Sequence, residues 1–335
     1  MKLIRKIDNL YVLIQSKFKI IKIKIINSNT ILIGHNSSFK STSRMKVWKC
    51  GKIMIGKNFS IGYNSEIYSW DEELIIGNNT SINDNCKIYG DVKIGSNCLF
   101  ASNIFISSGS HNYDIDPYLP IKVQDTLKNN NKRIIIEDDC WIGFGVVIMQ
   151  GVYIGKGSII GSNSVVTKDI LPYSINVGIP NRQISNRLEF NKRFNRIYCN
   201  IKEHWPYFYK GINYKKFQNI DDITKGIEVV DCNSVFLLAK NSNQKLTLSG
   251  FCNKKMEFEI QLNDNLYSKI TVNKGEFEEL IQLKNQYQDY PDYIYYSEEI
   301  KKHFNIITIK NIKNNFQASN IINNWLIKSI GYYED

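Results

Sequence analysis

The sequence contains no run of 18 apolar residues, so we expect no helix that spans a membrane. Its first 26 residues carry charges throughout and have no small-residue cleavage site, which argues against a secretory signal peptide. Histidine is scarce, with four residues among 335. The seven cysteines are an odd number, which does not suit a complete disulfide framework. We therefore expect a protein of the reducing cytoplasm.

Positive charge is in excess, with 43 Lys and Arg against 32 Asp and Glu and a formal net charge of +11. Such a charge indicates an anionic partner. No recognised nucleic-acid module is present, so we do not expect nucleic acid to be that partner. A phosphorylated cofactor, an acidic sugar or an anionic membrane face would each satisfy the same charge.

An aliphatic or aromatic residue recurs every six positions over two long stretches. A period of six fits neither the helical repeat of 3.6 nor a simple strand, and it predicts a parallel β-helix whose coils stack on one another. The repeated residues are Ile76, Ile82, Ile88, Ile94, Phe100 and Ile106, then Ile136, Ile142, Ile148, Ile154, Ile160 and Val166, with Ile55, Ile61 and Ile67 before them. The step from Ile67 to Ile76 is nine, which predicts a small protruding insertion.

The other positions of each hexad indicate one short strand and one turn. Three positions after the repeated residue stand residues that accept a left-handed backbone: Asn79, Asn85, Asp91, Asn97, Asn103 and Gly109, then Asp139, Gly145, Gly151, Gly157, Asn163 and Asp169. The next position is small or β-branched, as in Thr80, Cys98 and Cys140, and suits the inside of a narrow coil. Three such sides would close a triangular coil.

The repeat stops between Ile106 and Ile136, which predicts a loop over 107–135 ejected from the solenoid. Loops on a rigid scaffold are where binding and chemistry concentrate. This loop carries His111, with Asp114 and Asp116 close behind it. A histidine there can serve as a general base near neutral pH, although a lone loop histidine is more often a solvated bystander.

Four motifs stand in residues 141–184, namely Trp141-Ile142-Gly143, Gly151-Val152 before Ile154-Gly155, the run from Gly161 to Asp169, and Gly178-Ile179-Pro180-Asn181-Arg182. Together they resemble the acetyl-CoA-binding end of the hexapeptide-repeat acyltransferases, and the resemblance covers roughly residues 50–190. The family's active histidine lies on an ejected loop 17 residues after an Ile-Gly pair, which here is Ile94-Gly95 before His111. The family fold is a left-handed parallel β-helix, and its members include bacterial sugar and polysaccharide O-acetyltransferases.

The resemblance implies a site for acetyl-CoA and a base, with His111 as that base. By similarity the pantetheine arm passes Trp141, Phe144 and Ser162, and Thr167, Lys168 and Arg182 lie near the adenosine and phosphates, where cations have an electrostatic role. Lys168 also fits a solvated charge on the last coil. The family often has a second basic residue three positions after Arg182, and here that position is Ser185.

The family commonly places an Asn below the histidine to orient the acceptor, and in this register the position is Ser81. Asn85 fits a corner, so Asn83 is our candidate for the acceptor contact. Asp114 either orients the imidazole or contacts the acceptor. A related β-helix enzyme, the gamma-class carbonic anhydrase, holds zinc with histidines. Because only His35 and His111 lie in the solenoid region and such an ion needs three imidazoles, we expect no metal.

The resemblance further implies a homotrimer whose active site is shared between neighbours. Residues 1–30 form a basic amphipathic segment that either caps the β-helix domain of residues 31–185 or lies on the inner face of the cytoplasmic membrane. We expect residues 186–224 to form a helical linker, with a helix over 186–204. Eight short strand-like stretches within 225–335 predict a β-sandwich of the jelly-roll kind. Its tyrosines at 287, 290, 293, 295 and 296 would stack on sugars or serve as packing residues.

Three functional hypotheses follow. The first is an acetyl-CoA-dependent O-acetyltransferase that acts on a bacterial cell-surface saccharide, such as a capsular, lipooligosaccharide or O-antigen sugar. The appended sandwich favours a long glycan acceptor, which benefits from a second contact surface. The second is N-acetylation of an amino sugar nucleotide, since the same base serves an amine. The third is a non-catalytic solenoid scaffold, against which the retention of His111, Thr167-Lys168 and Arg182 argues.

Overall fold

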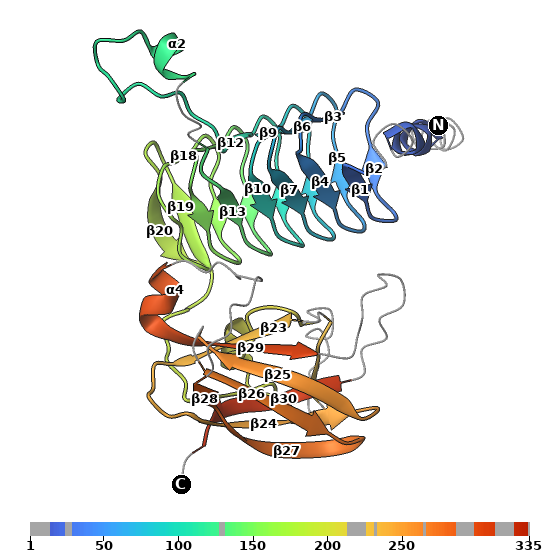
Figure 1. Cartoon of the computed structure of the whole chain (residues 1–335), viewed down its shortest axis with the longest axis vertical. Helices are drawn as coiled ribbons and strands as arrows, with labels where there is room; N and C mark the ends of the chain where they lie inside the picture. The colour runs from blue at the N-terminus through green and yellow to red at the C-terminus, as the bar shows by residue number, and fades with distance from the viewer. Residues whose placement is uncertain are drawn as a thin grey trace. The chain divides into compact units, whose positions relative to one another are not determined.

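The computed structural model describes residues 14–23, 29–126, 131–212, 226–230, 233–263, 266–285, 298–311 and 325–333. The chain divides into two compact units, one up to Phe190 and one from Asn191 onward, and both consist mainly of β-strands (Figure 1). No helix within the described ranges is long and apolar enough to cross a membrane.

The first unit is a three-sided parallel β-helix of six coils. The first face contains β1 (Ile31–Ile33), β4 (Lys52–Ile55), β7 (Glu73–Ile76), β10 (Val92–Ile94), β13 (Ile134–Ile136) and β16 (Tyr153–Ile154). The second face contains β2 (Ser38–Phe39), β5 (Ser60–Ile61), β8 (Ser81–Ile82), β11 (Leu99–Phe100), β14 (Trp141–Ile142), β17 (Ile159–Ile160), β19 (Ser174–Val177) and β20 (Arg182–Asn186). The third face contains β3 (Arg44–Val47), β6 (Glu66–Ser69), β9 (Lys87–Tyr89), β12 (Phe105–Ser107), β15 (Val147–Ile148) and β18 (Val165–Val166).

The six-residue pattern explains this shape. The repeated residues from Ile55 to Val166 are buried and form one continuous core along the axis of the solenoid. Most predicted corners adopt the left-handed conformation, for example Asn79 with φ 56° and Asn97 with φ 61°. The predicted corners Asp91, Gly109 and Asp169 do not. Gly90 takes the left-handed turn in place of Asp91, and the other two stand where the chain leaves a coil.

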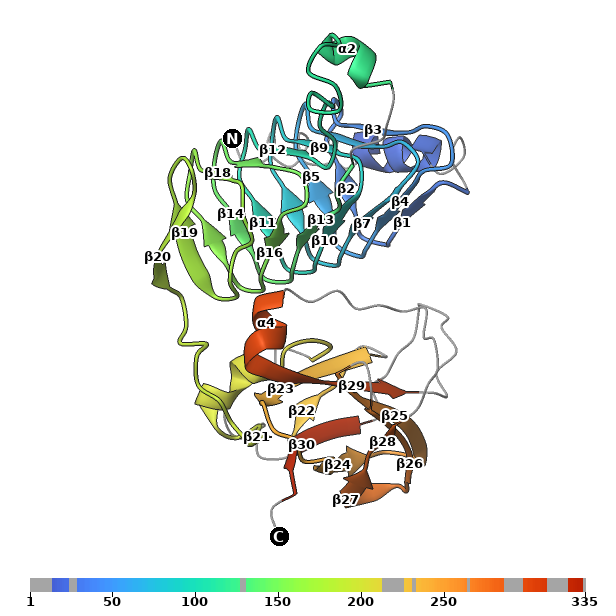
Figure 2. The ribbon, with the colours of Figure 1, turned by 60° about the vertical axis from the view of Figure 1, so that its left-hand side comes forward.

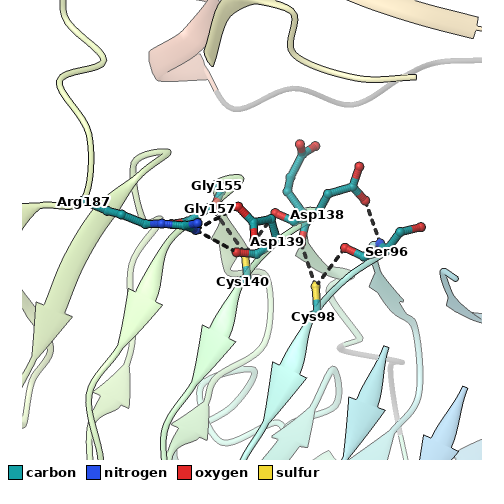
Figure 3. Close-up of polar contacts among 9 residues, drawn as sticks. Ser96, Cys98, Asp138, Asp139, Cys140, Gly155, Gly157 and Arg187 are labelled. Atoms are coloured by element: carbon teal, nitrogen blue, oxygen red, sulfur yellow. Dashed lines mark hydrogen bonds and ion pairs between the residues drawn. The ribbon is translucent and has the colours of Figure 1, made fainter. Parts of the chain in front are cut away.

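Small polar side chains link neighbouring coils from inside the corners (Figure 3). The Cys98 thiol donates to the Glu137 carbonyl at 3.1 Å, and the Cys140 thiol donates to the Gly155 carbonyl at 3.3 Å. Ser158, which follows Cys140 on the next coil, makes the same contact through its hydroxyl. Buried carbonyls therefore keep hydrogen-bond partners where the strands end. Burial raises the pKa of the Cys140 thiol, which stays protonated.

A helix over residues 14–23 covers the first coil. The Ser16 hydroxyl accepts a hydrogen bond from the Phe39 N–H at 2.8 Å, and Ile20 and Ile23 pack against the solenoid core. Lys19 donates to the carbonyls of Lys40 and Ser41 at 2.9 and 2.8 Å. Residues 14–23 therefore cap the first coil of the solenoid. The predicted contact with a membrane stays a prediction.

The second unit has the strand order of a jelly roll. One antiparallel sheet contains β22 (Ile227–Glu228), β30 (Trp325–Tyr332), β24 (Lys245–Cys252) and β27 (Gly275–Gln282), and β21 (Arg196–Tyr198) also pairs with β30. The other contains β23 (Asn233–Ala239), β29 (Phe304–Asn311), β25 (Met256–Leu262), β26 (Leu266–Val272) and β28 (Lys284–Asn285). When β21 and β28 are left out, the other eight strands of this unit can be numbered one to eight along the chain. The two sheets then have the strand orders one-eight-three-six and two-seven-four-five, which are those of a jelly roll and confirm the predicted fold.

The predicted helix over 186–204 is wrong. The chain continues instead through β21 and a 3-10 helix over Lys202–Tyr207, and a short helix, α4 (Glu298–His303), occurs later. The reason is a pairing that lies far away in the sequence, since Ile197 sits opposite Ile330 in the sheet and is fully buried there. Leu188 and Ile201, which the predicted helix would have buried, are 41% and 40% exposed. The tyrosines from 287 to 296 lie outside the described residues.

Candidate active site

The ejected loop leaves the third face after β12 and returns at β13, and it projects from the solenoid together with α2 (Ile121–Gln124) (Figure 1). Gln124 organises its interior, since this side chain is buried although it belongs to a surface loop. Its carbonyl oxygen accepts from the N–H groups of Ile115 and Asp116 at 3.0 and 3.2 Å. Its amide donates to the Leu119 carbonyl at 2.7 Å. This organising role of Gln124 was not predicted, because one glutamine in an irregular loop has no periodic signal.

His111 is held by Asp125. The imidazole Nδ1 lies 2.7 Å from Asp125 Oδ2, and Asp125 Oδ1 accepts from the Asn112 N–H at 3.2 Å. The hydrogen bond with His111 lowers the pKa of the Asp125 carboxyl, which stays ionised. The alternative in which Asp114 orients the imidazole is therefore wrong. Asp114 is exposed, and its contact with an acceptor stays a prediction.

The pair fixes which nitrogen of His111 is available for chemistry. A carboxylate accepts only, so Nδ1 carries the proton and the lone pair lies on Nε2. The His111 side chain is 80% exposed, which leaves Nε2 open to an incoming group. An oriented imidazole with a free lone pair is the arrangement required of a general base.

Both legs of the loop are anchored to the solenoid. On the returning leg, Arg133 Nε lies 2.7 Å from Asp91 Oδ1, and the Asn131 amide donates to Glu72 Oε1 at 2.5 Å. The Lys132 N–H donates to the Ser108 carbonyl at 2.9 Å and so joins the two legs. His111 thus lies close to the point where the loop is anchored to the solenoid, because only three residues separate it from Ser107, where β12 ends.

The predicted acetyl-CoA residues follow the edge between the second and third faces. Trp141 lies on β14, a strand of the second face that is labelled in Figure 2. The Trp141 residue is 52% exposed, and Phe144, at the corner that follows, is 46% exposed. Ser162 holds the same place one coil further on and is exposed. A Cβ atom on Gly143 would come within 2.7 Å of the Ile160 oxygen and the Ser162 nitrogen, so only glycine allows the coils to stack this closely at the edge.

The predicted phosphate contacts separate into two places. The Asn181 N–H donates to the Val165 carbonyl, which places the adjacent, exposed Arg182 above the edge that carries Phe144 and Ser162. Thr167 and Lys168 are also exposed, but they lie past the other end of β18. The structure therefore brings Arg182 to the proposed cofactor edge, whereas Lys168 lies beyond the opposite end of β18.

The acceptor candidate Asn83 lies on the cofactor edge as well. The Asn83 N–H donates to Phe100, and the Gly143 N–H makes the equivalent bond to Ile160 two coils further on. At about 4.8 Å per coil, these positions are roughly 10 Å apart. Asn83 is exposed, whereas Asn85 has φ 59° and is the corner residue that we expected. The loop with His111 leaves the solenoid from the opposite edge of the third face.

Within the described part of the chain, no group of three or more His, Cys, Asp or Glu residues is arranged to hold a metal ion. His35 lies on the first coil, whereas the loop with His111 leaves from the fourth.

Comparison with known proteins supports the resemblance seen in the sequence. The bacterial transferase hexapeptide family (six repeats) matches residues 74–103 and 133–168. A putative acetyltransferase of Saccharomyces cerevisiae is 32% identical over 164 residues, which are 48% of this chain and 76% of that protein. The galactoside O-acetyltransferase of Escherichia coli K12 is 36% identical over 133 residues, 38% of this chain and 61% of that enzyme. A putative lipopolysaccharide biosynthesis O-acetyl transferase of the same organism is 28% identical over 136 residues, 39% and 69% of the two chains.

These matches and the β-helix define a hexapeptide-repeat transferase, and the chain belongs to the hexapeptide-repeat acetyltransferase family. The matched part spans only about half the length of several curated relatives, namely 55%, 42% and 61%.

Proposed function

We propose that this protein is an acetyl-CoA-dependent O-acetyltransferase whose acceptor is a hydroxyl group of a bacterial cell-surface saccharide, such as a capsular, lipooligosaccharide or O-antigen sugar. The observation that carries the proposal is the His111–Asp125 pair, which presents a free Nε2 from a loop of a hexapeptide β-helix. Two relatives support the acceptor class, because their names specify transfer to a galactoside and lipopolysaccharide biosynthesis.

The proposed reaction is a single acyl transfer. His111 Nε2 takes the proton of the acceptor hydroxyl while the oxygen attacks the thioester carbonyl. The tetrahedral intermediate then expels the thiolate, so a C–O bond forms and the C–S bond breaks. The proton passes from His111 to the thiolate, and the products are an acetyl ester and coenzyme A. Asp125 stabilises the imidazolium that forms between these steps.

The edge formed by Phe144, Ser162 and Arg182 suits the donor. It is narrow, exposed and lined with turn backbone, and the exposed Trp141 indole lies beside it. A pantetheine arm would run along this edge, with its amides on turn backbone and its phosphates near Arg182. Thr167 and Lys168 would serve the adenosine end from the far side of β18. We expect the reaction to occur in the cytoplasm, where the donor acetyl-CoA is present.

The two halves of the proposed site come from opposite edges of the third face, which favours a homotrimer. His111 of one copy would then act on an acceptor held by Asn83 of a neighbouring copy, with Asp114 as a further acceptor contact. Leu99 and Trp141 stand side by side on the second face, with 58% and 52% exposure, and provide an apolar surface for a neighbour to cover.

Mixing two inactive variants tests the shared site. Neither His111→Ala nor Phe144→Asp alone should transfer acetyl. A trimer that contains both should regain a fraction of the activity, because one of its sites would combine an intact loop with an intact cofactor edge. No recovery after subunit exchange, with exchange verified by mass, would place each site within one chain.

The test of the function is transfer of labelled acetyl from acetyl-CoA to a panel of surface oligosaccharides and amino sugar nucleotides. We expect alkali-labile label that is lost in His111→Ala and retained in the control His35→Ala. Alkali-stable label would indicate an amine acceptor. Absence of transfer together with absence of acetyl-CoA binding would indicate the non-catalytic scaffold.

A further inference from the structure

Aromatic side chains cover part of the outer surface of the third face. We call Trp48, Tyr68, Trp70, Tyr89 and Phe105 the aromatic platform. The Trp48 and Trp70 rings are stacked, with centroids 5.8 Å apart and 13° between their planes, and Tyr68 and Tyr89 are stacked at 5.1 Å and 11°. Edge-to-face contacts at 5.3 and 6.0 Å join Trp48 to Tyr68 and Tyr89 to Phe105. The platform is thus one continuous array of rings.

The array is not needed to fill the solenoid core. Tyr68 and Tyr89 stand opposite each other in the parallel register and point away from the core, which the hexad residues Ile67 and Ile88 fill. Trp48, Trp70 and Phe105 remain 39%, 37% and 41% exposed. Several large, partly exposed rings side by side form a contiguous apolar patch, which indicates a contact surface.

Charged groups lie among the rings. The Tyr89 hydroxyl donates to the Glu66 carboxylate at 2.6 Å, and Glu66 also lies 3.8 Å from Arg44. The Lys46 ammonium lies 5.7 Å from the ring centroids of both Trp48 and Tyr68. Flat apolar faces bordered by hydrogen-bonding groups suit a sugar ring, which has an apolar C–H face and a rim of hydroxyls. The core of an interface between protein copies is instead depleted of charged residues.

The platform continues into the base of the His111 loop. Trp70 belongs to the insertion that the nine-residue step predicts, and Glu72 of that insertion accepts the hydrogen bond from Asn131 on the loop's returning leg. Phe105 lies on β12, whose end is the start of the loop. A chain bound along the platform would therefore lead toward the loop that carries the proposed base.

We propose that the aromatic platform binds successive sugar units of the acceptor, so that the acceptor is a glycan chain rather than a single sugar. The proposal rests on the proposed function. From β3 to β12 the platform extends over three coil spacings, or about 14 Å, which is the length of a short oligosaccharide. Binding units beyond the one acetylated would raise the affinity for long acceptors through additional contacts on the same chain.

The test compares acceptors of graded length, from monosaccharide to hexasaccharide, prepared from bacterial capsular and lipooligosaccharide glycans. We expect kcat/KM to rise with length in the wild type. In Trp48→Ala and Trp70→Ala the ratio of hexasaccharide to monosaccharide kcat/KM should fall about tenfold for each lost ring. Trp70→Phe, which keeps a ring, should retain most of the preference. Leu32→Ala is the matched control, since Leu32 lies on the first coil with 54% exposure but on the first face.

If the wild type transfers acetyl without a preference for longer acceptors, the proposal that the platform binds sugar units is overturned and the proposed function remains intact. Calorimetric binding of the same oligosaccharides without acetyl-CoA tests the platform even if no transfer occurs. Binding that is lost in both tryptophan variants would support it, and no binding by the wild type would overturn it. Dissociation of the assembly in these variants, seen by sedimentation, would identify the platform as an interface between copies and overturn the proposal.

Discussion

Asp125→Asn gives the sharpest test of the proposed base. The variant keeps the size of the side chain and removes its charge. Asp125 has two partners, the Asn112 N–H on Oδ1 and His111 Nδ1 on Oδ2. Because the Asn112 N–H can only donate, it selects the amide oxygen of an asparagine. The amide NH2 of the variant then points toward His111.

That orientation inverts the tautomer of His111. An NH2 group facing Nδ1 requires Nδ1 to accept, so the ring proton moves to Nε2, where the base must receive the acceptor's proton. General-base catalysis contributes about 10²–10⁴-fold, and we expect Asp125→Asn to lose about 10²-fold in kcat. Asp125→Ala removes the orienting group without imposing the wrong tautomer, and we expect a loss of about tenfold.

The assay is the initial rate of coenzyme A release, followed with a thiol reagent at saturating acetyl-CoA. The KM for acetyl-CoA should stay unchanged in both variants, since Asp125 lies on the loop and not on the cofactor edge. Lys122→Gln is the matched control, because it removes an exposed charge from the same loop and has no role in the proposed site. An Asp125→Asn variant more active than Asp125→Ala would refute the tautomer argument, and wild-type rates in both would remove Asp125 from the mechanism.

Two further predictions concern stability, measured as the free energy of unfolding in urea. Cys140→Ala should lose about 1 kcal/mol because the buried Gly155 carbonyl loses its side-chain donor and keeps only the long bond from the Ser158 N–H, at 3.3 Å. Cys140→Ser should stay within about 0.5 kcal/mol, since Ser158 already makes this contact through a hydroxyl one coil further on. Equal losses in the two variants would refute the role of the hydrogen bond. Burial, with the nearby Arg44 charge, lowers the pKa of the Lys19 ammonium to about 8. Between pH 8 and 10.5 the unfolded chain then binds more protons at this site than the folded chain does. The free energy of unfolding should therefore rise with pH in the wild type relative to Lys19→Met. Parallel pH profiles of the two proteins would contradict the lowered pKa.

The residues of the solenoid were predictable because each coil repeats a local rule. A left-handed asparagine such as Asn79, an inward isoleucine such as Ile82 and a small residue such as Thr80 each act within a few residues of chain. The strands of the second unit were predictable for a similar reason, since alternation along a strand reflects one buried face. The helix predicted over 186–204 failed because the pairing of Ile197 with Ile330 outweighed a local helical pattern.

The sequence by itself determined the coils, their corners, the position of the ejected loop and the histidine on it, because these depend on local periodicity and on its interruption. Only the tertiary structure identified Asp125 as the partner of His111, since an irregular loop has no repeat that relates two residues 14 positions apart. It also assembled the aromatic platform. Trp48, Tyr68 and Tyr89 belong to different coils, and only the stacking of those coils brings rings about 20 residues apart into contact.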